Sequence, residues 1–368
     1  MKNILRLKRI YLLLLYLISY ALILLAKHNI YFAEQIYALH IYKWISQAVS
    51  SVTGIIPFSL AELLFFFCPV AALSILIWFA VRMIMIREER RSRLFKGILN
   101  LLCMVSVLLF IFVIFAGINY YRYPFSYYSK LEVRDSSLDE LLQMTESLAI
   151  QAGELREKVP CTDEQGVFKL SMSHRELAEL ENKVYLQLAE DYPVLGGKYG
   201  NAKQVLLSSL MSYTEITGIF IPFTMEANVN VAVPDYTIPA TMFHEMSHLR
   251  GFMREDEANF IAYLAGMKSD DVELQYSSTM LALIVSGNAL YDKDKELYMQ
   301  VRDLYTEGVL KDIRANTLYW QQFDQSVVST ISDKINDTYL KANAQTDGVQ
   351  SYGRMVDLLL AKYRKDRK

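Results

Sequence analysis

Residues 244–248 read His-Glu-Met-Ser-His, inside a segment (236–250) whose apolar spacing predicts a helix. Two histidines four positions apart project from one helix face, about one turn from each other. That spacing allows both imidazoles to reach one tetrahedral zinc ion. Glu245, next to the first histidine, can take a proton from a metal-activated water without being a ligand itself. The stretch therefore predicts a zinc site with Glu245 as general base.

A catalytic zinc site needs a third protein ligand, and the residues after the motif offer two carboxylates. Glu255 is the preferred candidate, with Asn259 one turn later on the same face as a partner that orients a ligand. Glu257 is the alternative. On a helix the two glutamates point about 200° apart, so only one of them can bind the same ion.

Other catalytic chemistries find little support in the sequence. The chain has neither a GxSxG elbow nor a glycine loop that would cradle phosphate. Cys68 and Cys103 lie in apolar runs, Cys161 has no evident partner, and no CxxC pair is present. The net charge of −2 gives no electrostatic footprint for nucleic acid, and none is expected as a partner.

Most of the apolar excess lies in the first third of the chain. Three runs approach or exceed the length of a spanning helix, at about 10–26, 60–81 and 98–118. Basic residues precede the first run and fill the loop between the second and third. By the positive-inside rule both basic segments are cytoplasmic, so everything after about residue 119 lies outside the cytoplasmic membrane. The chain is thus expected to be a multi-pass membrane protein with a cytoplasmic N-terminus.

The segment 30–49, between the first two runs, mixes aromatic and aliphatic side chains with polar ones. It is interpreted as an amphipathic helix on the outer membrane surface, or equally as an ordinary packed helix. A cluster of tyrosines at 120–128, just after the third run, is typical of a membrane–water interface. Residues 1–119 are therefore predicted to form a membrane domain.

Residues 120–368 are predicted to form a mainly helical extracytoplasmic domain. Ser137 and Glu140 form the pattern of a capping box at a helix start. Strand character is confined to 218–233, which predicts a small sheet next to the metal helix. The part at 229–233 could pair with an extended peptide, or simply support the helix. Helical spacing is found near 137–157, 173–190, 203–216, 236–250, 253–267, 271–290, 294–312 and 350–364.

The segments 221–230, 244–265, 336–341 and 351–357 resemble a family of uncharacterised bacterial membrane proteins, domain-of-unknown-function family 3810, which is grouped with zincin-like peptidases. The resemblance covers nearly the whole chain, including the three apolar runs. It implies a zincin-like metallopeptidase domain. The Glu-x-x-Ala-Asn block at 255–259 also resembles that of gluzincins, which implies Glu255 as third ligand and Asn259 as its orienting partner.

The spacing departs from both common zincin patterns. Glu255 follows His248 much more closely than in many gluzincins. Gly251 resembles the glycine of the metzincin pattern, but the third ligand of that pattern would fall at Arg254, which cannot bind zinc. The choice between Glu255 and Glu257 stays open at this point.

Three more side chains are candidates for orienting a ligand or stabilising an oxyanion: Glu226, Tyr339 and Tyr352. The function expected from the sequence is that of a membrane-anchored zinc peptidase acting on a peptide or protein substrate. The alternative is a zincin-fold signalling or assembly protein that binds metal or peptide with little turnover. Intact Glu245 favours the peptidase, because a site that only binds would not need a base.

Overall fold

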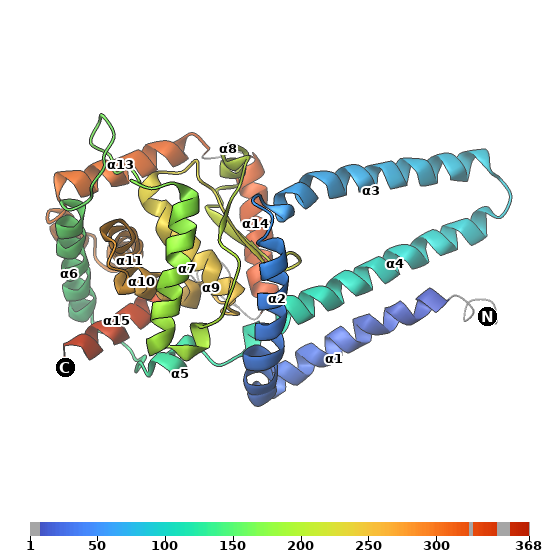
Figure 1. Cartoon of the computed structure of the whole chain (residues 1–368), viewed down its shortest axis with the longest axis horizontal. Helices are drawn as coiled ribbons and strands as arrows, with labels where there is room; N and C mark the ends of the chain where they lie inside the picture. The colour runs from blue at the N-terminus through green and yellow to red at the C-terminus, as the bar shows by residue number, and fades with distance from the viewer. Residues whose placement is uncertain (1–7, 324–326, 344–353, 368) are drawn as a thin grey trace.

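The computed structural model describes residues 8–323, 327–343 and 354–367. It is mainly helical and contains one sheet of three short strands. Three long helices extend from one side of a helical domain that holds the rest of the described chain (Figure 1). The predicted class, a mainly helical chain with three N-terminal apolar helices and a small sheet, is confirmed at this level.

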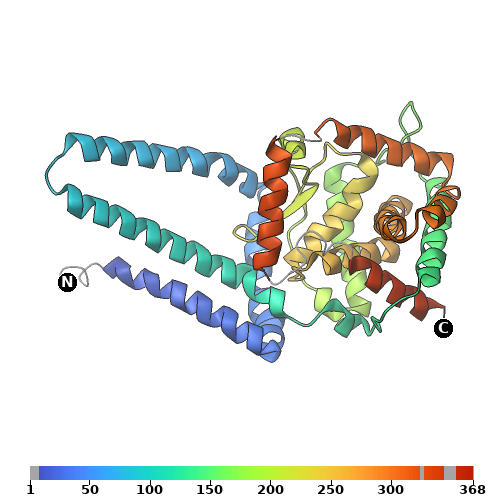
Figure 2. The same cartoon turned by 180° about the vertical axis from the view of Figure 1, so that it is seen from behind.

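Each of the three helices is long and apolar enough to cross a membrane. The first combines the 3-10 turn η1 with α1, and the other two are α3 and α4. α1 packs along α4, whereas α3 has no buried residue and stands apart over most of its length (Figures 1 and 2). Their bounds are η1 Lys8–Leu13, α1 Leu14–His28, α3 Leu60–Met85 and α4 Arg90–Phe115.

The third helix starts and ends earlier than the sequence predicted. α4 begins at Arg90, so most of the basic residues of the expected loop lie on the helix itself, whereas Arg87 stays in the turn before it. It stops at Phe115, and the 3-10 turn η3 (Gly117–Tyr121) follows. Arg122, just after this turn, donates to the Glu34 carboxylate at 2.7 and 3.0 Å in a buried ion pair. This pair joins the chain after the third helix to the segment between the first two.

The helix expected at 30–49 is present but longer, and it is built in two parts. These are the π-helix η2 (Phe32–Tyr42) and α2 (Lys43–Thr53). Tyr37 and Tyr42 are buried in a second core cluster, together with Leu249 and Met253 from the domain. The segment is therefore packed against the domain on one side, and its other side is exposed.

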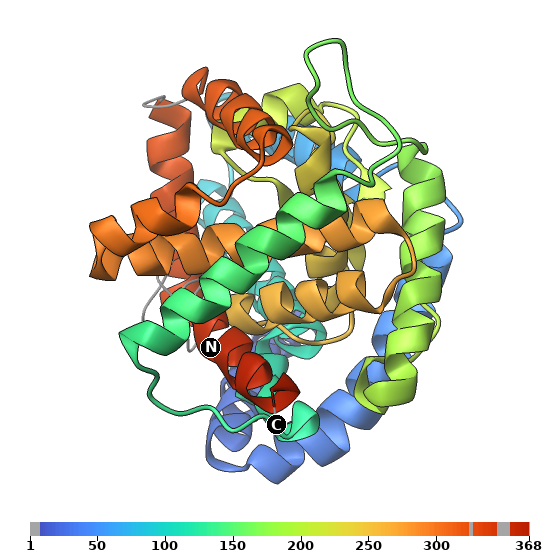
Figure 3. The same ribbon diagram turned by 90° about the vertical axis from the view of Figure 1, so that its left-hand side faces the viewer.

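Within the domain, α6 (Leu138–Arg156) begins with the expected capping box. The Ser137 hydroxyl accepts from the Glu140 amide at 3.1 Å, and the Glu140 carboxylate accepts from the Ser137 amide at 3.1 Å. Behind α6 lie α10 and α11, which pack against each other and form the centre of the main core with α9 (Figure 3). The remaining helices cover this centre. The bounds of the central helices are α9 Ile238–Leu249, α10 Glu255–Lys268 and α11 Val272–Lys293. Those of the others are α5 Phe125–Ser129, α7 His174–Asp191, η4 Pro193–Leu195, α8 Ser208–Met211, η5 Ser212–Thr214, η6 Asp235–Thr237, α12 Lys295–Arg302, α13 Glu307–Gln321, α14 Val327–Ala342 and α15 Met355–Asp366.

The sheet has the strand order β1-β3-β2 and lies next to the metal helix. β1 (Lys203–Gln204) pairs parallel to β3 (Glu226–Val229), and β2 (Gly218–Ile221) pairs antiparallel to β3. β3 is central, and all four of its residues are buried. It therefore offers no open edge to a peptide. Of the expected strand 229–233 only Val229 belongs to β3, and residues 230–233 are not in a strand, so the possible pairing role of this segment has no support in the structure. The edge strand that faces the site is β2.

Several helix boundaries differ from the sequence prediction because tertiary contacts override local spacing. The segment 203–216 is not one helix but β1, the short α8 and the turn η5, since Lys203 and Gln204 pair with β3. The segment 294–312 is split into α12 and α13. The helix expected at 350–364 begins within the described residues at Met355. The helix α14 was not predicted.

Candidate metal centre

The metal helix α9 ends in a tight reversal that places the next ligand. Gly251 has φ +91°, a conformation that favours glycine. The Gly251 amide donates to the His248 carbonyl at 2.8 Å, and the Phe252 amide donates to the Ser247 carbonyl at 3.2 Å. These are the two bonds of a Schellman motif. The chain then turns back, and α10 begins at Glu255, above the histidine face of α9.

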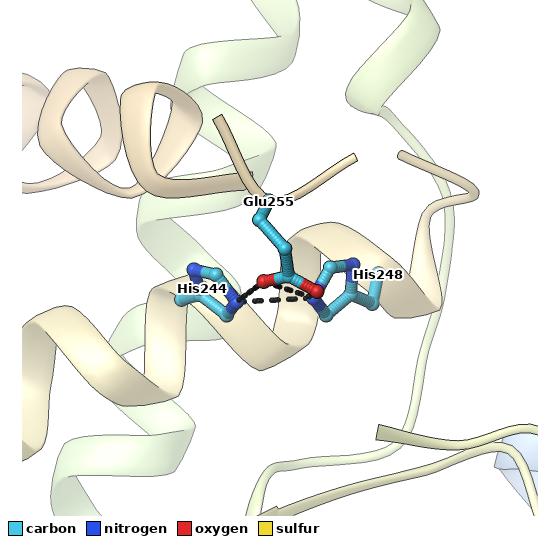
Figure 4. A group of neighbouring side chains, drawn as sticks. All are labelled: His244, His248 and Glu255. Carbon is cyan, nitrogen blue, oxygen red and sulfur yellow. Dashed lines mark hydrogen bonds and ion pairs between the residues drawn. The ribbon is translucent and has the colours of Figure 1, made fainter. Parts of the chain in front are cut away.

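Three side chains from these two helices converge on one point (Figure 4). His244 Nε2 lies 3.0 Å from His248 Nε2 and 3.1 Å from Glu255 Oε2. His248 Nε2 lies 3.6 Å from the same carboxylate oxygen. The three side chains are mostly buried, with exposures of 12%, 9% and 11%. Among the described residues they form the one group of histidine, cysteine and carboxylate side chains that could hold a metal ion.

The second nitrogen of each imidazole is already engaged. His244 Nδ1 lies 2.7 Å from Asn259 Oδ1, and His248 Nδ1 lies 2.7 Å from the Phe252 carbonyl oxygen. Both partners are acceptors in this arrangement, so Nδ1 donates in each contact, and in the neutral imidazole each Nε2 keeps its lone pair towards the centre. Partners of this kind fix the tautomer and orientation of histidine ligands in metal sites.

Charge is strongly coupled between the imidazoles and the carboxylate. Burial opposes protonation of His248, but the nearby Glu255 carboxylate outweighs it and raises the pKa of His248 to about 9. Burial likewise opposes ionisation of Glu255, but the two imidazoles outweigh it and hold the pKa of that carboxyl well below its usual range. The Glu255 carboxylate therefore favours positive charge on the imidazole groups that face it.

Glu245 lies beside the cluster without being part of it. It is 4% exposed, and burial raises the pKa of its carboxyl, an effect that the positive charge of the imidazoles partly opposes. Its Oε2 atom has no hydrogen-bond partner among the described residues. The backbone of β2 runs close by, since a Cβ added to Gly218 would lie 2.5 Å from Glu245 Oε1. The carboxylate is thus enclosed on the side of β2.

The other candidate residues occupy different places. Glu257 points away from the imidazoles and accepts the Phe125 amide at 2.9 Å, and burial raises its pKa to about 7. Tyr339, on α14, is 38% exposed along its ring, and its hydroxyl accepts from the Tyr120 hydroxyl at 3.0 Å. Burial of that hydroxyl, with a smaller contribution from the negative charge of Glu255, raises the pKa of Tyr339. Tyr352 lies outside the described residues.

Glu226 is not in the metal cluster but at the junction with α3. Its carboxylate accepts the amides of Leu60 and Ala61 at 3.1 and 2.8 Å, at the start of α3. Lys203 donates to the same carboxylate at 2.5 Å. A buried carboxylate at a helix N-terminus is stabilised by the unsatisfied amides of the first turn. The candidate role of Glu226 at the site therefore has no geometric support.

Sequence reasoning did not identify Gly218, Phe220 or Tyr42 at the site. The Phe220 ring packs 6.3 Å from the His248 ring, and the Tyr42 hydroxyl donates to the His248 carbonyl at 3.2 Å. Of these three residues, only Gly218 could have been recognised from the sequence, because an isolated glycine in a strand pattern often marks a close approach of the backbone to another group. The contacts of the other two join segments far apart in the chain.

A comparison with protein families gives one match. Residues 37–360 match the family described as "Protein of unknown function (DUF3810)". The chain belongs to this family. The matched region includes the second and third apolar helices, the whole metal cluster and α14. No match was found among curated proteins or among solved structures.

Proposed function

We propose that this member of the DUF3810 family is a membrane-anchored, zinc-dependent peptidase with Glu245 as general base. One observation carries the proposal. Two imidazole nitrogens and one carboxylate oxygen converge next to a buried carboxylate that binds none of them. This combination of three protein ligands and an adjacent base is typical of hydrolytic zinc sites.

The donor set fits zinc in both chemistry and spacing. Zinc binds histidine nitrogen at about 2.0–2.1 Å, and two ligands of a tetrahedron at that radius lie about 3.3 Å apart. The three donor atoms are separated by 3.0, 3.1 and 3.6 Å. His244, His248 and Glu255 would hold the ion. When bound, zinc supplies a Lewis acid that activates water and polarises a carbonyl group.

Glu245 is suited to accept the proton that such a reaction releases. Its burial raises the pKa of the carboxyl, which makes it a stronger base than an exposed glutamate. Its unpartnered Oε2 can accept a proton without breaking an existing hydrogen bond. The backbone at Gly218 lies close against the carboxylate and limits its movement on that side. The same oxygen can then return the proton to the leaving amine.

Two further groups could position a peptide. β2 is an edge strand whose other side is paired with β3, so an extended peptide can add to its open edge by backbone hydrogen bonds. The Tyr339 hydroxyl accepts a bond from Tyr120, which leaves its own proton to be donated to a developing oxyanion. Tyr339 thus keeps the candidate role that the sequence suggested.

The proposed sidedness rests on charge. Arg87 lies in the turn between α3 and α4, and Arg90 and Arg91 begin α4. This turn lies at the end of these helices away from the domain (Figure 1). The start of the first apolar helix, which leads into α1, lies on the same side (Figure 1). Under the positive-inside rule this side is cytoplasmic. The metal centre would then lie outside the cytoplasmic membrane.

The test compares the full-length zinc protein with its Glu245→Gln variant. A pool of quenched fluorescent peptides of randomised sequence serves as substrate, and zinc is measured by mass spectrometry. We expect Glu245→Gln to keep its zinc and to lose hydrolysis by a factor of about 10²–10⁴. Glu257→Gln, a neighbouring buried carboxylate outside the cluster, is the matched control and should keep both. A zinc-loaded wild-type protein that cleaves no peptide, or a fully active Glu245→Gln, would refute the peptidase function.

A further inference from the structure

The helix α14 (Val327–Ala342) has an unusual distribution of side chains. Its buried residues are Ser329 and Leu340, at 4% and 0% exposure, with Asn336 half-buried on the same side. Its large apolar residues are exposed instead: Val328 48%, Ile331 52%, Ile335 65% and Tyr339 38%. These four recur at i, i+3, i+7 and i+11, so they form one stripe along the helix. The helix therefore presents an apolar stripe away from the protein.

Tyr339, the last residue of the stripe, shows which part of the protein the stripe lies next to. The Tyr339 ring lies 6.2 Å from the Phe112 ring, in the last turn of α4, in an edge-on contact. Lys334, Asp337 and Lys341 recur on another side of the helix. α14 runs across the base of the α3–α4 pair, where these helices meet the domain (Figures 1 and 2). The apolar stripe thus continues the apolar surface of the spanning helices.

The helix α2 has the same arrangement at the same level of the molecule. Small polar side chains, Ser46 and Ser50, are buried against the domain at 0% and 1% exposure. On α2, Trp44 is 73% exposed and Val52 66%, and Ile55, in the turn after the helix, is 80% exposed. α2 also lies across the base of the three long helices (Figure 1). Two separate segments therefore turn small polar groups inward and large apolar groups outward, both next to the spans.

This distribution is costly in water and favourable at a bilayer surface. Each exposed apolar side chain is stabilised when its surface is removed from water, in proportion to the apolar area covered. Helices that lie in the membrane interface bury an apolar face among lipid headgroups and acyl chains, and tryptophan is enriched there. The apolar spans fix the bilayer at this level of the molecule. Lipid therefore accounts for both stripes.

The metal centre lies between these two helices. The Tyr42 hydroxyl, in the last turn of η2 that leads into α2, donates to the carbonyls of His248 and Leu249 at 3.2 and 3.3 Å. On the other side, the Tyr339 hydroxyl of α14 accepts from the Tyr120 hydroxyl at 3.0 Å, and Tyr120 packs in the same core cluster as Leu249 and Met253. Both helices are thus joined to the segment that carries His248, α2 through η2 and α14 through Tyr120. The site is held at the membrane surface rather than at the far end of the domain.

We propose that α2 and α14 lie on the bilayer surface and that the substrate is the membrane-proximal stretch of a polypeptide anchored in the same bilayer. The substrate class rests on the proposed peptidase function. An anchored chain that leaves the bilayer beside the protein is held at the height of the metal centre, and its local concentration there is high. A free peptide in solution has no such advantage.

The position of the two helices can be tested without any activity. The chain has three tryptophans, so Trp78→Phe with Trp320→Phe leaves Trp44 as the sole probe. A second protein carries Ile335→Trp with all three native tryptophans replaced by phenylalanine, and its matched control carries Lys334→Trp instead. In phosphatidylcholine–phosphatidylglycerol vesicles, brominated lipids should quench Trp44 and a tryptophan at 335 strongly, and one at 334 weakly. Equal quenching of tryptophans at 334 and 335 would overturn the placement of α14 on the bilayer surface. If Trp44 were not quenched, the placement of α2 on that surface would be overturned.

The substrate class is tested with one randomised peptide pool in two forms. One form is free, and the other carries a palmitoyl chain and is incorporated in the same vesicles as the zinc-loaded protein. We expect the anchored form to be cleaved about 10-fold faster or more at equal total concentration. Ile335→Glu should reduce this preference, whereas Lys334→Glu should keep it. Equal cleavage of both forms would overturn the substrate class and leave the peptidase function intact. No cleavage of either form would refute the peptidase function, while the quenching result would still decide the position of the helices.

Discussion

Asn259 Oδ1 lies 2.7 Å from His244 Nδ1, and this contact connects the two helices that build the metal centre. His244 comes from α9, and Asn259 lies one turn after Glu255 on α10. The contact orients the imidazole, and it also fixes the rotation of α10 about its axis. That rotation brings Glu255 towards the imidazoles and turns Glu257 away towards the Phe125 amide.

Asn259→Ala should weaken zinc binding by about 10- to 100-fold, because the imidazole loses the group that holds its tautomer and direction. Glu255→Gln should weaken it further, since a direct ligand is lost. Competition with a chromophoric chelator measures both affinities. Glu257→Gln is the matched control and should bind zinc as the wild type does. Zinc loss in Glu257→Gln with normal binding in Glu255→Gln would reverse the choice of third ligand.

Gly218→Ala should reduce hydrolysis without removing the metal. The new Cβ would meet Glu245 Oε1 at 2.5 Å and Thr241 Cγ2 at 2.7 Å, so the carboxylate must shift. A displacement of about 1 Å in a catalytic group can cost about 100-fold in rate. The readouts are peptide hydrolysis and zinc content of the same sample.

The control for Gly218 is Gly287→Ala, in the middle of α11. There the new Cβ would make an ordinary contact of 3.4 Å with the Tyr298 ring. We expect unchanged activity and a stability gain of up to about 1 kcal/mol from helix propensity. Full activity in Gly218→Ala would show that the backbone of β2 does not position the base.

Glu226→Gln should destabilise the junction between α3 and the domain. It would leave the buried Lys203 ammonium, which also donates to the carbonyls of Thr53 and Phe58, without its counter-charge. Removing one partner of a buried ion pair costs about 3–5 kcal/mol. The melting temperature in detergent should therefore fall clearly. Adding Lys203→Met should restore part of the loss, and a double variant that is as unstable as the single one would contradict this explanation.

Glu181→Gln should stabilise the protein at neutral and higher pH. Glu181 is fully buried on α7, and neither of its carboxylate oxygens has a hydrogen-bond partner among the described residues. Burial raises the pKa of this carboxyl well above its usual value, although the charge of Arg250 partly opposes the shift. Above the pKa of the unfolded chain, about 4.3, only the folded protein still holds the proton.

Between the pKa of the unfolded chain and the raised pKa of Glu181 in the folded protein, the free energy of unfolding therefore falls by about 1.4 kcal/mol for each pH unit. Below the pKa of the unfolded chain this loss of stability is absent. Melting temperatures of the wild type and of Glu181→Gln should be close near pH 4 and should diverge as the pH rises. Glu179→Gln, on an exposed part of the same helix, should follow the wild type. Parallel curves for Glu181→Gln and the wild type would show that Glu181 is ionised in the folded protein.

What the sequence alone determined about this protein is local in origin. The four-residue spacing of His244 and His248 places both on one face of any helix they form, because the helical repeat is fixed. The three long apolar runs, the capping box at Ser137 and the helical character of the domain depend on side chains close together in the chain. These features are all present in the structure, although α4 begins at Arg90, well before the start of the third run at about residue 98.

The tertiary structure alone decided the features that join distant segments. Glu255 and Glu257 are equivalent in local pattern, and only the packing of α10 on α9 selects the one that meets the imidazoles. β1 replaces part of an expected helix because β3 supplies its backbone partners. The outward apolar stripe of α14 is favourable only next to the spans. Helical periodicity predicts the faces of a helix but not what covers each face, so the sequence alone could not decide this.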